Sequence, residues 1–172
     1  MSHPQQRAFT EEVKRRFPQF FTEKDVLDCG SLDMNGNNRF LFNGGKYVGV
    51  DAFAGKNVDI VCRVHELGED IGRFDVVIST EMLEHDEFWQ KSLKKMIDVL
   101  RCGGLLIVTC ATTGRGEHLT NRTEHIPGYD WRNYYRNIAE KDWWDVINVG
   151  EVFGEFEFKV VGTDLYFWGI KK

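Results

Sequence analysis

Short apolar runs alternate along the chain with stretches in which apolar residues recur every three or four positions. The apolar runs predict strands over residues 24–29, 47–50, 58–62, 75–79 and 105–110. The last run, LLIVTC, has no polar alternation, which is typical of a strand covered on both faces. Strands that alternate with helical stretches favour βαβ units and a mostly parallel sheet.

Three helices are expected around these strands. The first is expected to begin at Thr10, a residue that can cap it, and to end at about Phe17. The clearest, over about residues 86–101, has one apolar face, and the pair Gly103–Gly104 is expected to end it. A third helix is expected over residues 140–149, with tryptophans on its apolar side that are expected to pack in the core or on the C-terminal strands.

The chain ends in two more strand-like runs, residues 155–162 and 165–170, which a turn joins into a predicted hairpin. The predicted fold class is therefore α/β: a Rossmann-like, mostly parallel sheet of about seven strands with a C-terminal antiparallel β-hairpin. A single domain is expected over residues 1–172, in which residues 1–22 form an N-terminal helical extension. Residues 111–137 carry no clear pattern and are expected to be a functional loop.

Composition narrows the choice of function. The 172 residues suit one domain, and the net charge of −5 disfavours a protein that mainly grips phosphate backbones. No apolar segment suggests a signal peptide or a membrane span, so a cytoplasmic protein is expected. None of the four cysteines forms a C-x-x-C pair, so neither a structural zinc site nor disulfides are expected and no metal ligand is assigned.

The ends of the first two strands carry the residues of a nucleoside-binding site. Gly30 permits a tight turn after the first strand, and Asp51 closes the second strand 23 residues after Asp28. An acid at about this distance is well placed to accept hydrogen bonds from ribose hydroxyls. The G-x-G-x-x-G fingerprint is absent, because Leu32 stands at its second glycine, and this disfavours NAD or FAD.

Four segments together resemble a known family. They are VLDCGSLDMNGN (26–37), YVGVD (47–51), FDVVISTEMLEH (74–85) and LRCGGLLIVT (100–109). In this order and spacing they resemble class I S-adenosylmethionine-dependent methyltransferases, specifically the small methyltransferase-domain proteins of type 11. The resemblance spans about residues 26–170.

The resemblance implies S-adenosylmethionine as cofactor, with S-adenosylhomocysteine as product. It implies that Asp28 and Gly30 lie at the methionine part, that Asp51 holds the ribose, and that two residues after the third strand line the adenine. The full set of implied cofactor residues is Asp28, Gly30, Ser31, Asp51, Ala52, Phe53, Val64, His65, Thr80, Glu81 and Met82.

The sequence departs from the family pattern in the residues expected to face the cofactor. Leu32 and Met34 replace two glycines that the first loop of the family commonly carries. Arg63 stands near the position where the family often has an acid that binds the adenine amine.

Three histidines are candidates for a general base that takes a proton from the methyl acceptor. His85 is the first, because it follows the fourth strand at the start of the long helix; the alternative is that it only packs there or caps the helix. His125 and His118 are the second and third, with an exposed loop histidine as the alternative for each. Other residues that could shape an acceptor pocket are Arg115, Arg122, Tyr129, Tyr134 and Tyr135.

The favoured function is methyl transfer from S-adenosylmethionine to an oxygen or nitrogen of a small-molecule acceptor. Sugars or glycan precursors are suggested by the resemblance alone. The alternative is a non-catalytic S-adenosylmethionine-binding module or a methyltransferase subunit that needs a partner. Nucleic acid is disfavoured as acceptor, because the N/D-P-P-Y/F motif of N6-adenine methyltransferases is replaced by STEM at 79–82. A Rossmann oxidoreductase ranks below these, and the oligomeric state is not specified by the sequence.

Overall fold

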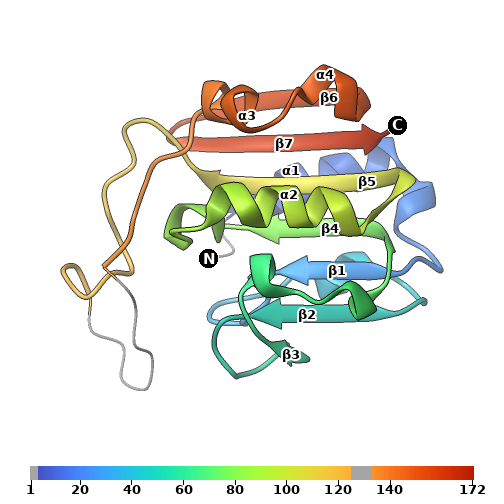
Figure 1. The fold of residues 1–172 in the computed structure, drawn as a ribbon, viewed down its shortest axis with the longest axis horizontal. Coiled ribbons are helices and arrows are strands. Elements are labelled where there is room, and N and C mark those ends of the chain that lie inside the picture. Colours follow the sequence, from blue (N-terminus) through green and yellow to red (C-terminus); the bar gives the residue numbers. More distant parts are fainter. Residues whose placement is uncertain (1–3, 125–132) are drawn as a thin grey trace.

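A computed structural model describes residues 4–124 and 133–172 of the chain. Seven strands form one sheet in the order β3-β2-β1-β4-β5-β7-β6 (Figure 1). Their bounds are β1 (Val26–Cys29), β2 (Tyr47–Asp51), β3 (Ile60–Val61), β4 (Phe74–Thr80), β5 (Leu100–Ala111), β6 (Phe153–Val161) and β7 (Asp164–Lys171). The first five strands are parallel, whereas β7 is antiparallel to both β5 and β6. The predicted fold class is confirmed.

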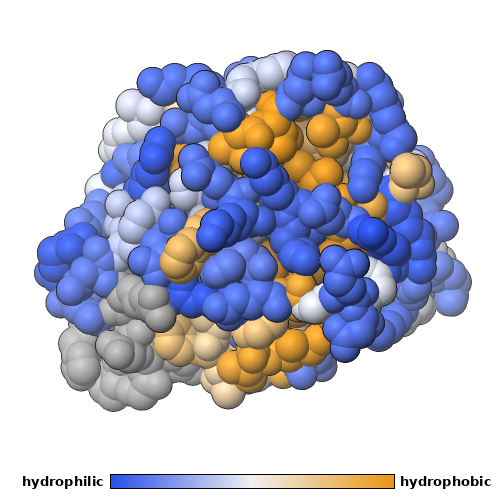
Figure 2. Space-filling view, viewed as in Figure 1, coloured by the Kyte–Doolittle hydropathy of each residue, from blue (hydrophilic) through white to orange (hydrophobic). Residues whose placement is uncertain are grey.

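Helices cover both faces of this sheet. The α-helices are α1 (Pro4–Arg16), α2 (Trp89–Val99), α3 (Glu140–Val146) and α4 (Val149–Val152). Short 3-10 turns are η1 (Pro18–Phe20), η2 (Arg39–Leu41), η3 (Val64–Glu66), η4 (Glu69–Ile71) and η5 (Leu83–His85). In Figure 1, α2, α3 and α4 lie on the near face and α1 lies behind the sheet. On the near face, Figure 2 shows hydrophobic residues both above α2 and near the edge that carries β2 and β3.

The core lies in two layers, one on each face of the sheet. Alternate side chains of a strand point to opposite faces. Accordingly, Leu106 and Val108 of β5 join the cluster under α2, and Leu105 and Ile107 join the cluster under α1. All four are buried, which explains the lack of polar alternation in this strand.

The first helix begins earlier than the sequence pattern suggests. Thr10 lies inside α1, is buried, and donates a side-chain hydrogen bond to the backbone oxygen of Arg7 at 3.0 Å. A threonine hydroxyl in this position bonds back to the preceding turn and caps nothing. Pro4 is the first residue of the helix, a position that suits proline because the N–H it lacks would have no partner there.

The glycine pair after α2 does not end that helix, so this prediction is wrong. Leu100 is already extended, with φ −78° and ψ 132°, and Gly103 and Gly104 lie inside β5. The β4–β5 pairing shifts register there, since Phe74 pairs with Leu100 and the next regular pair involves Leu105. Gly103 has φ +75°, a conformation that favours glycine. The pair therefore shapes an irregularity in the strand.

The third predicted helix is two helices. Ile147 is extended, with φ −141° and ψ 151°, and separates α3 from α4. Trp143 is fully buried, and its ring lies 4.6 Å from that of Phe167 and 5.4 Å from that of Phe158. Core packing is thus confirmed for Trp143. Trp144 is 44% exposed, and its ring contacts Phe156 of β6, with centroids 6.2 Å apart, which confirms packing on the C-terminal strands.

Candidate functional site

A cavity of about 170 Å³ opens at the carboxyl ends of the parallel strands. Ligands of open α/β sheets bind at this edge, because each strand delivers its following loop there. The lining residues are Asp28, Gly30, Ser31, Leu32, Met34, Asn35, Gly36, Asn37, Asn38, Asp51, Ala52, Phe53, Cys62, Arg63, Val64, Thr80, Glu81, Met82, His85, Asp86, Glu87, Leu119 and Tyr134.

The lining includes ten of the eleven residues that the sequence predicts at the cofactor, although their roles stay predictions. His65 is the exception: its ring packs against Phe88, with centroids 4.5 Å apart. The asparagines of the first loop, Leu119 and the acidic pair Asp86–Glu87 also line the cavity and were missed. The sequence locates site residues only at the first few positions after each strand, and these residues lie further along the loops.

Gly30 holds the first loop tightly against the loop that follows β4. It has φ +81°, and its N–H donates to the backbone oxygen of Val50 at 2.8 Å. A Cβ at this position would lie 2.5 Å from the Cβ of Met82. The turn glycine identified in the sequence is therefore required by backbone conformation and by a close approach.

Gly30→Ala is expected to lower the free energy of unfolding by about 2 kcal/mol, because it adds a steric clash to an unfavourable φ. Urea unfolding of the variant measures the effect. Gly72→Ala is the matched control, since Gly72 has φ +87° but nothing within 4 Å of an added Cβ. Equal losses in the two variants would mean that the contact with Met82 contributes nothing.

Asp28 is a buried carboxyl in the lining of the cavity. The Tyr47 hydroxyl donates to its Oδ2 at 2.6 Å, and Asn57 Nδ2 lies 3.5 Å from the same oxygen. Burial raises the pKa of Asp28 to about 6; the Tyr47 hydrogen bond lowers it and the charge of Asp51 raises it. Its Oδ1 is buried and has no hydrogen-bond partner among the described residues.

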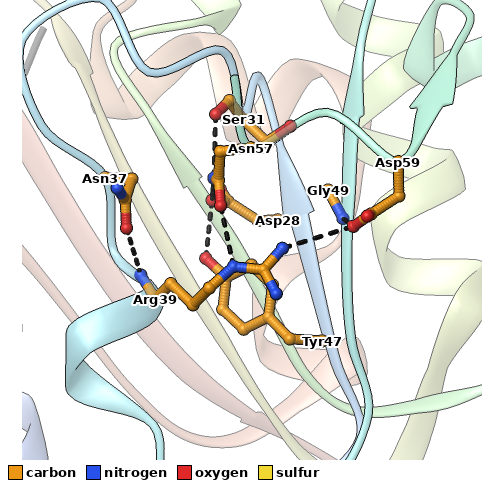
Figure 3. Close-up of polar contacts among 8 residues, drawn as sticks. All are labelled: Asp28, Ser31, Asn37, Arg39, Tyr47, Gly49, Asn57 and Asp59. Carbon is orange, nitrogen blue, oxygen red and sulfur yellow. Dashed lines mark hydrogen bonds and ion pairs between the residues drawn. The ribbon is translucent and has the colours of Figure 1, made fainter. Parts of the chain in front are cut away.

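A polar network outside the cavity holds this carboxyl and the first loop (Figure 3). Asn57 adopts φ +72° and donates to the backbone oxygen of Ser31 at 2.9 Å. Arg39 Nε donates to Asn57 Oδ1 at 2.8 Å and its guanidinium pairs with Asp59 at 3.3 Å. Asp59 in turn accepts from the N–H of Gly49 at 2.7 Å. No sequence pattern predicted this network. Asparagine tolerates positive φ, so Asn57 was the only residue that could have indicated it.

Asp51 organises the loops on either side of it. Its Oδ2 accepts from the N–H of Leu32 at 3.1 Å and its Oδ1 from the N–H of Phe53 at 3.0 Å. Burial raises the pKa of Asp51, and these two backbone donors oppose the increase. Leu32 is the residue at the second glycine position of the fingerprint. Its backbone N–H thus helps to hold the Asp51 carboxylate in place.

Arg63 lies in the cavity wall, but its charge is matched. Its guanidinium pairs with Glu87 at 3.2 Å and lies over the ring of Phe88, 5.5 Å from the centroid. Glu87 also lines the cavity, so a carboxylate stands beside the position where the family often has an acid.

The candidate base His85 also lines the cavity. Its ring is 5.0 Å from that of His118 and 5.4 Å from that of Tyr135. Burial, and then the neighbouring His118, lowers the pKa of His85 to about 3, so its imidazole is neutral at pH 7. His118 comes from the loop after β5, and the structure brings these two candidates together.

A buried acid that the sequence analysis missed lies next to His85. Glu84 is fully buried, and burial together with the charge of Glu81 raises its pKa to about 8. Glu81 itself accepts a hydrogen bond from Thr109 Oγ1 at 2.8 Å. Glu84 could have been identified from the sequence, because it directly precedes the candidate base His85 in the segment FDVVISTEMLEH.

The residues predicted at the acceptor do not all meet the cavity. Tyr134 lines it, and Tyr135 contacts the two histidines from the side. Arg115 pairs instead with Asp164 at 3.3 Å, and Arg122 pairs with Glu117 at 2.6 Å. The predicted residues His125 and Tyr129 lie outside the described residues.

Comparison with known proteins establishes the class. A family model described as a methyltransferase domain matches residues 1–161. The chain belongs to this methyltransferase-domain family, and the predicted class, a class I S-adenosylmethionine-dependent methyltransferase, is confirmed. No curated protein matches the sequence.

Solved structures share the fold at low sequence identity. The chain is similar to 1,6-didemethyltoxoflavin-N1-methyltransferase from Burkholderia thailandensis, solved with bound 1,6-didemethyltoxoflavin and S-adenosylhomocysteine: 18% identity, 96% of this chain, 77% of that chain and TM-score 0.65. It is similar to the N-terminal domain of EvdMO1, solved in the presence of S-adenosylhomocysteine and D-fucose: 16% identity, 100% and 85% coverage, TM-score 0.66. It is also similar to a 16S rRNA methyltransferase from T. thermophilus: 17% identity, 100% of this chain, 44% of that chain, TM-score 0.59.

Among the described residues, no helix is long and apolar enough to cross a membrane.

Proposed function

We propose that the cavity binds S-adenosylmethionine with its ribose on Asp51 and its methionine part near Asp28 and Gly30. The observation that carries this proposal is the meeting of the predicted cofactor residues and His85 in one cavity at the carboxyl edge of the sheet. The residues fit a charged, hydrogen-bonding ligand, since Asp28 Oδ1 and Ser31 Oγ are buried with no partner in the described part of the chain.

The residues of this chain position the acceptor for methyl transfer. The cofactor supplies a methyl group on a sulfonium, which is already a strong electrophile. Transfer would need the lone pair of an acceptor oxygen or nitrogen to be held toward that methyl group, with S-adenosylhomocysteine as the released product. Holding the acceptor close and in line can supply up to about 7–11 kcal/mol of the barrier reduction. The acceptor proton must leave, and His85 and His118 are the described candidates to take it.

We further propose a small-molecule acceptor, of which a sugar is one kind. Two observations support it: the neighbours include a toxoflavin-type enzyme and a domain solved in the presence of D-fucose, and the chain is acidic overall. Residues 111–137 are proposed to select the acceptor, because their described part brings His118, Leu119 and Tyr134 to the cavity side. Trimming this segment is expected to change the range of acceptors.

A thermal melt with S-adenosylmethionine tests the cofactor assignment, with NADH as control. At 100 times its dissociation constant a ligand adds about 2.7 kcal/mol, so Tm is expected to rise by about 5–10 °C. NADH is expected to leave Tm unchanged. No rise at millimolar S-adenosylmethionine would contradict the proposal. A rise without transfer to any sugar or small-molecule acceptor in a radiolabel assay would favour a non-catalytic module or a subunit that needs a partner.

A further inference from the structure

Two histidines and a glutamate from two separate segments meet beside the cavity. Glu84 and His85 are consecutive residues of η5, and His118 lies in the loop that follows β5. One ligand atom of each residue lies within 4.8 Å of the others. We propose that Glu84, His85 and His118 bind a divalent first-row transition-metal cation such as Zn²⁺, Mn²⁺ or Co²⁺.

No described side chain pairs with the Glu84 and His85 atoms that would bind the cation. Glu84 is fully buried, and only backbone N–H groups, those of Glu84 itself and of Ala111, act on its carboxyl. Both ring nitrogens of His85 are buried and lack a hydrogen-bond partner within residues 4–124 and 133–172. A buried polar group left unpaired destabilises the folded protein, so a ligand that satisfies these atoms stabilises the site.

His118 is oriented as metal-binding histidines commonly are. Its Nδ1 lies 3.0 Å from the backbone oxygen of Gly116. When Nδ1 donates to that oxygen, Nε2 keeps a free lone pair, which is the tautomer that binds a metal through Nε2. Tyr135 packs against both histidine rings, at 5.4 and 5.0 Å, and its buried hydroxyl has no partner in the described chain.

The ligand set indicates the class of cation. Two imidazoles and one carboxylate are the protein ligands of open zinc and non-haem iron sites, whereas Mg²⁺ and Ca²⁺ prefer oxygen ligands alone. With bonds of about 2.1 Å, neighbouring ligand atoms lie roughly 3–4 Å apart. The separations here, up to 4.8 Å, would have to shorten by about 1 Å when all three residues bind one cation.

The position of the site gives the cation a use, which rests on the proposed function. His85 lines the cofactor cavity, so a cation bound to it would lie at the cavity wall. A bound cation would orient an acceptor oxygen and lower the pKa of its hydroxyl. With the cation bound, His85 and His118 would act as its ligands and not as the general base, and the acidified hydroxyl would lose its proton to water.

Direct binding of the metal tests the site without any acceptor. Chelator-treated full-length protein is titrated with Co²⁺, whose visible absorption reports nitrogen and oxygen ligands, and Zn²⁺ is then added as competitor. One Co²⁺ per chain is expected, displaced by Zn²⁺. His118→Ala and, as an isosteric change, Glu84→Gln are each expected to weaken Co²⁺ binding by at least ~100-fold. His65→Ala, which removes the other described histidine, should retain it.

The S-adenosylmethionine melt of the same proteins separates the two proposals. His118→Ala is expected to keep the cofactor-dependent rise in Tm, which also shows that the variant is folded. No Co²⁺ bound at 1 mM, or equal binding by the parent and His118→Ala, would overturn the cation site and leave the cofactor assignment intact. Cation binding without a rise in Tm would overturn the cofactor assignment alone.

Discussion

Asp51→Ala is expected to weaken S-adenosylmethionine binding by at least ~100-fold. Hydrogen bonds to a charged group contribute about 1.5–3 kcal/mol each, so the loss of two ribose contacts removes about 3 kcal/mol or more. The substitution also removes the acceptor for the N–H groups of Leu32 and Phe53, which hold the loops on either side of the cavity. Isothermal titration of the variant with the cofactor measures the loss.

Two further variants show whether the carboxylate itself is responsible. Asp51→Asn keeps the size of the side chain and one oxygen acceptor, and it is expected to lose part of the affinity. Asp98→Ala removes an exposed acid of α2 far from the lining residues and is expected to bind the cofactor normally. Unchanged affinity in Asp51→Ala, with an intact unfolding transition, would refute the ribose assignment.

Asp28→Asn is expected to raise the free energy of unfolding at pH 7.5 by about 3 kcal/mol. Burial raises the pKa of Asp28 from 3.8 to about 6 in the folded protein, so folding favours the protonated carboxyl. The stability from this group is complete below pH 4 and is lost as pH rises toward 6, at 1.36 kcal/mol per pKa unit. Asparagine does not titrate, so the gain over the parent is expected to fall to about 0.5 kcal/mol at pH 4. Urea unfolding at pH 4.0 and 7.5 measures the difference.

Asp75, a carboxyl at the start of β4, is expected to have the opposite effect on the free energy of unfolding. Burial raises the pKa of Asp75, but the backbone N–H of Asp25 and the guanidinium of Arg101 outweigh this effect and lower it. Asp75→Asn is therefore expected to be less stable than the parent at pH 7.5. If Asp28→Asn were also destabilised there, the cost of burying its charge would not be the dominant effect. The same Asp28→Asn protein is expected to bind S-adenosylmethionine more weakly, which would make Asp28 a residue that trades stability for function.

Much of the fold follows from local pattern. The apolar runs predicted all five parallel strands and both strands of the hairpin, because a buried strand needs apolar side chains wherever it runs. The errors fell at helix ends, as with Thr10 and the pair Gly103–Gly104. A residue type that suits a helix end also suits another structure. Thr10 bonds back to Arg7 inside a helix that begins at Pro4, and the pairing with β4 places the two glycines inside β5.

The sequence by itself determined the class of protein and the edge of the sheet where its site lies. Gly30 and Asp51 could be located at this edge from the sequence, because the loops after all parallel strands of a sheet open at the same edge. Only the tertiary structure brought Tyr47 to Asp28, and His118 to Glu84. Such pairs are far apart in the chain, and their distances depend on how strands and loops pack, which no local pattern encodes.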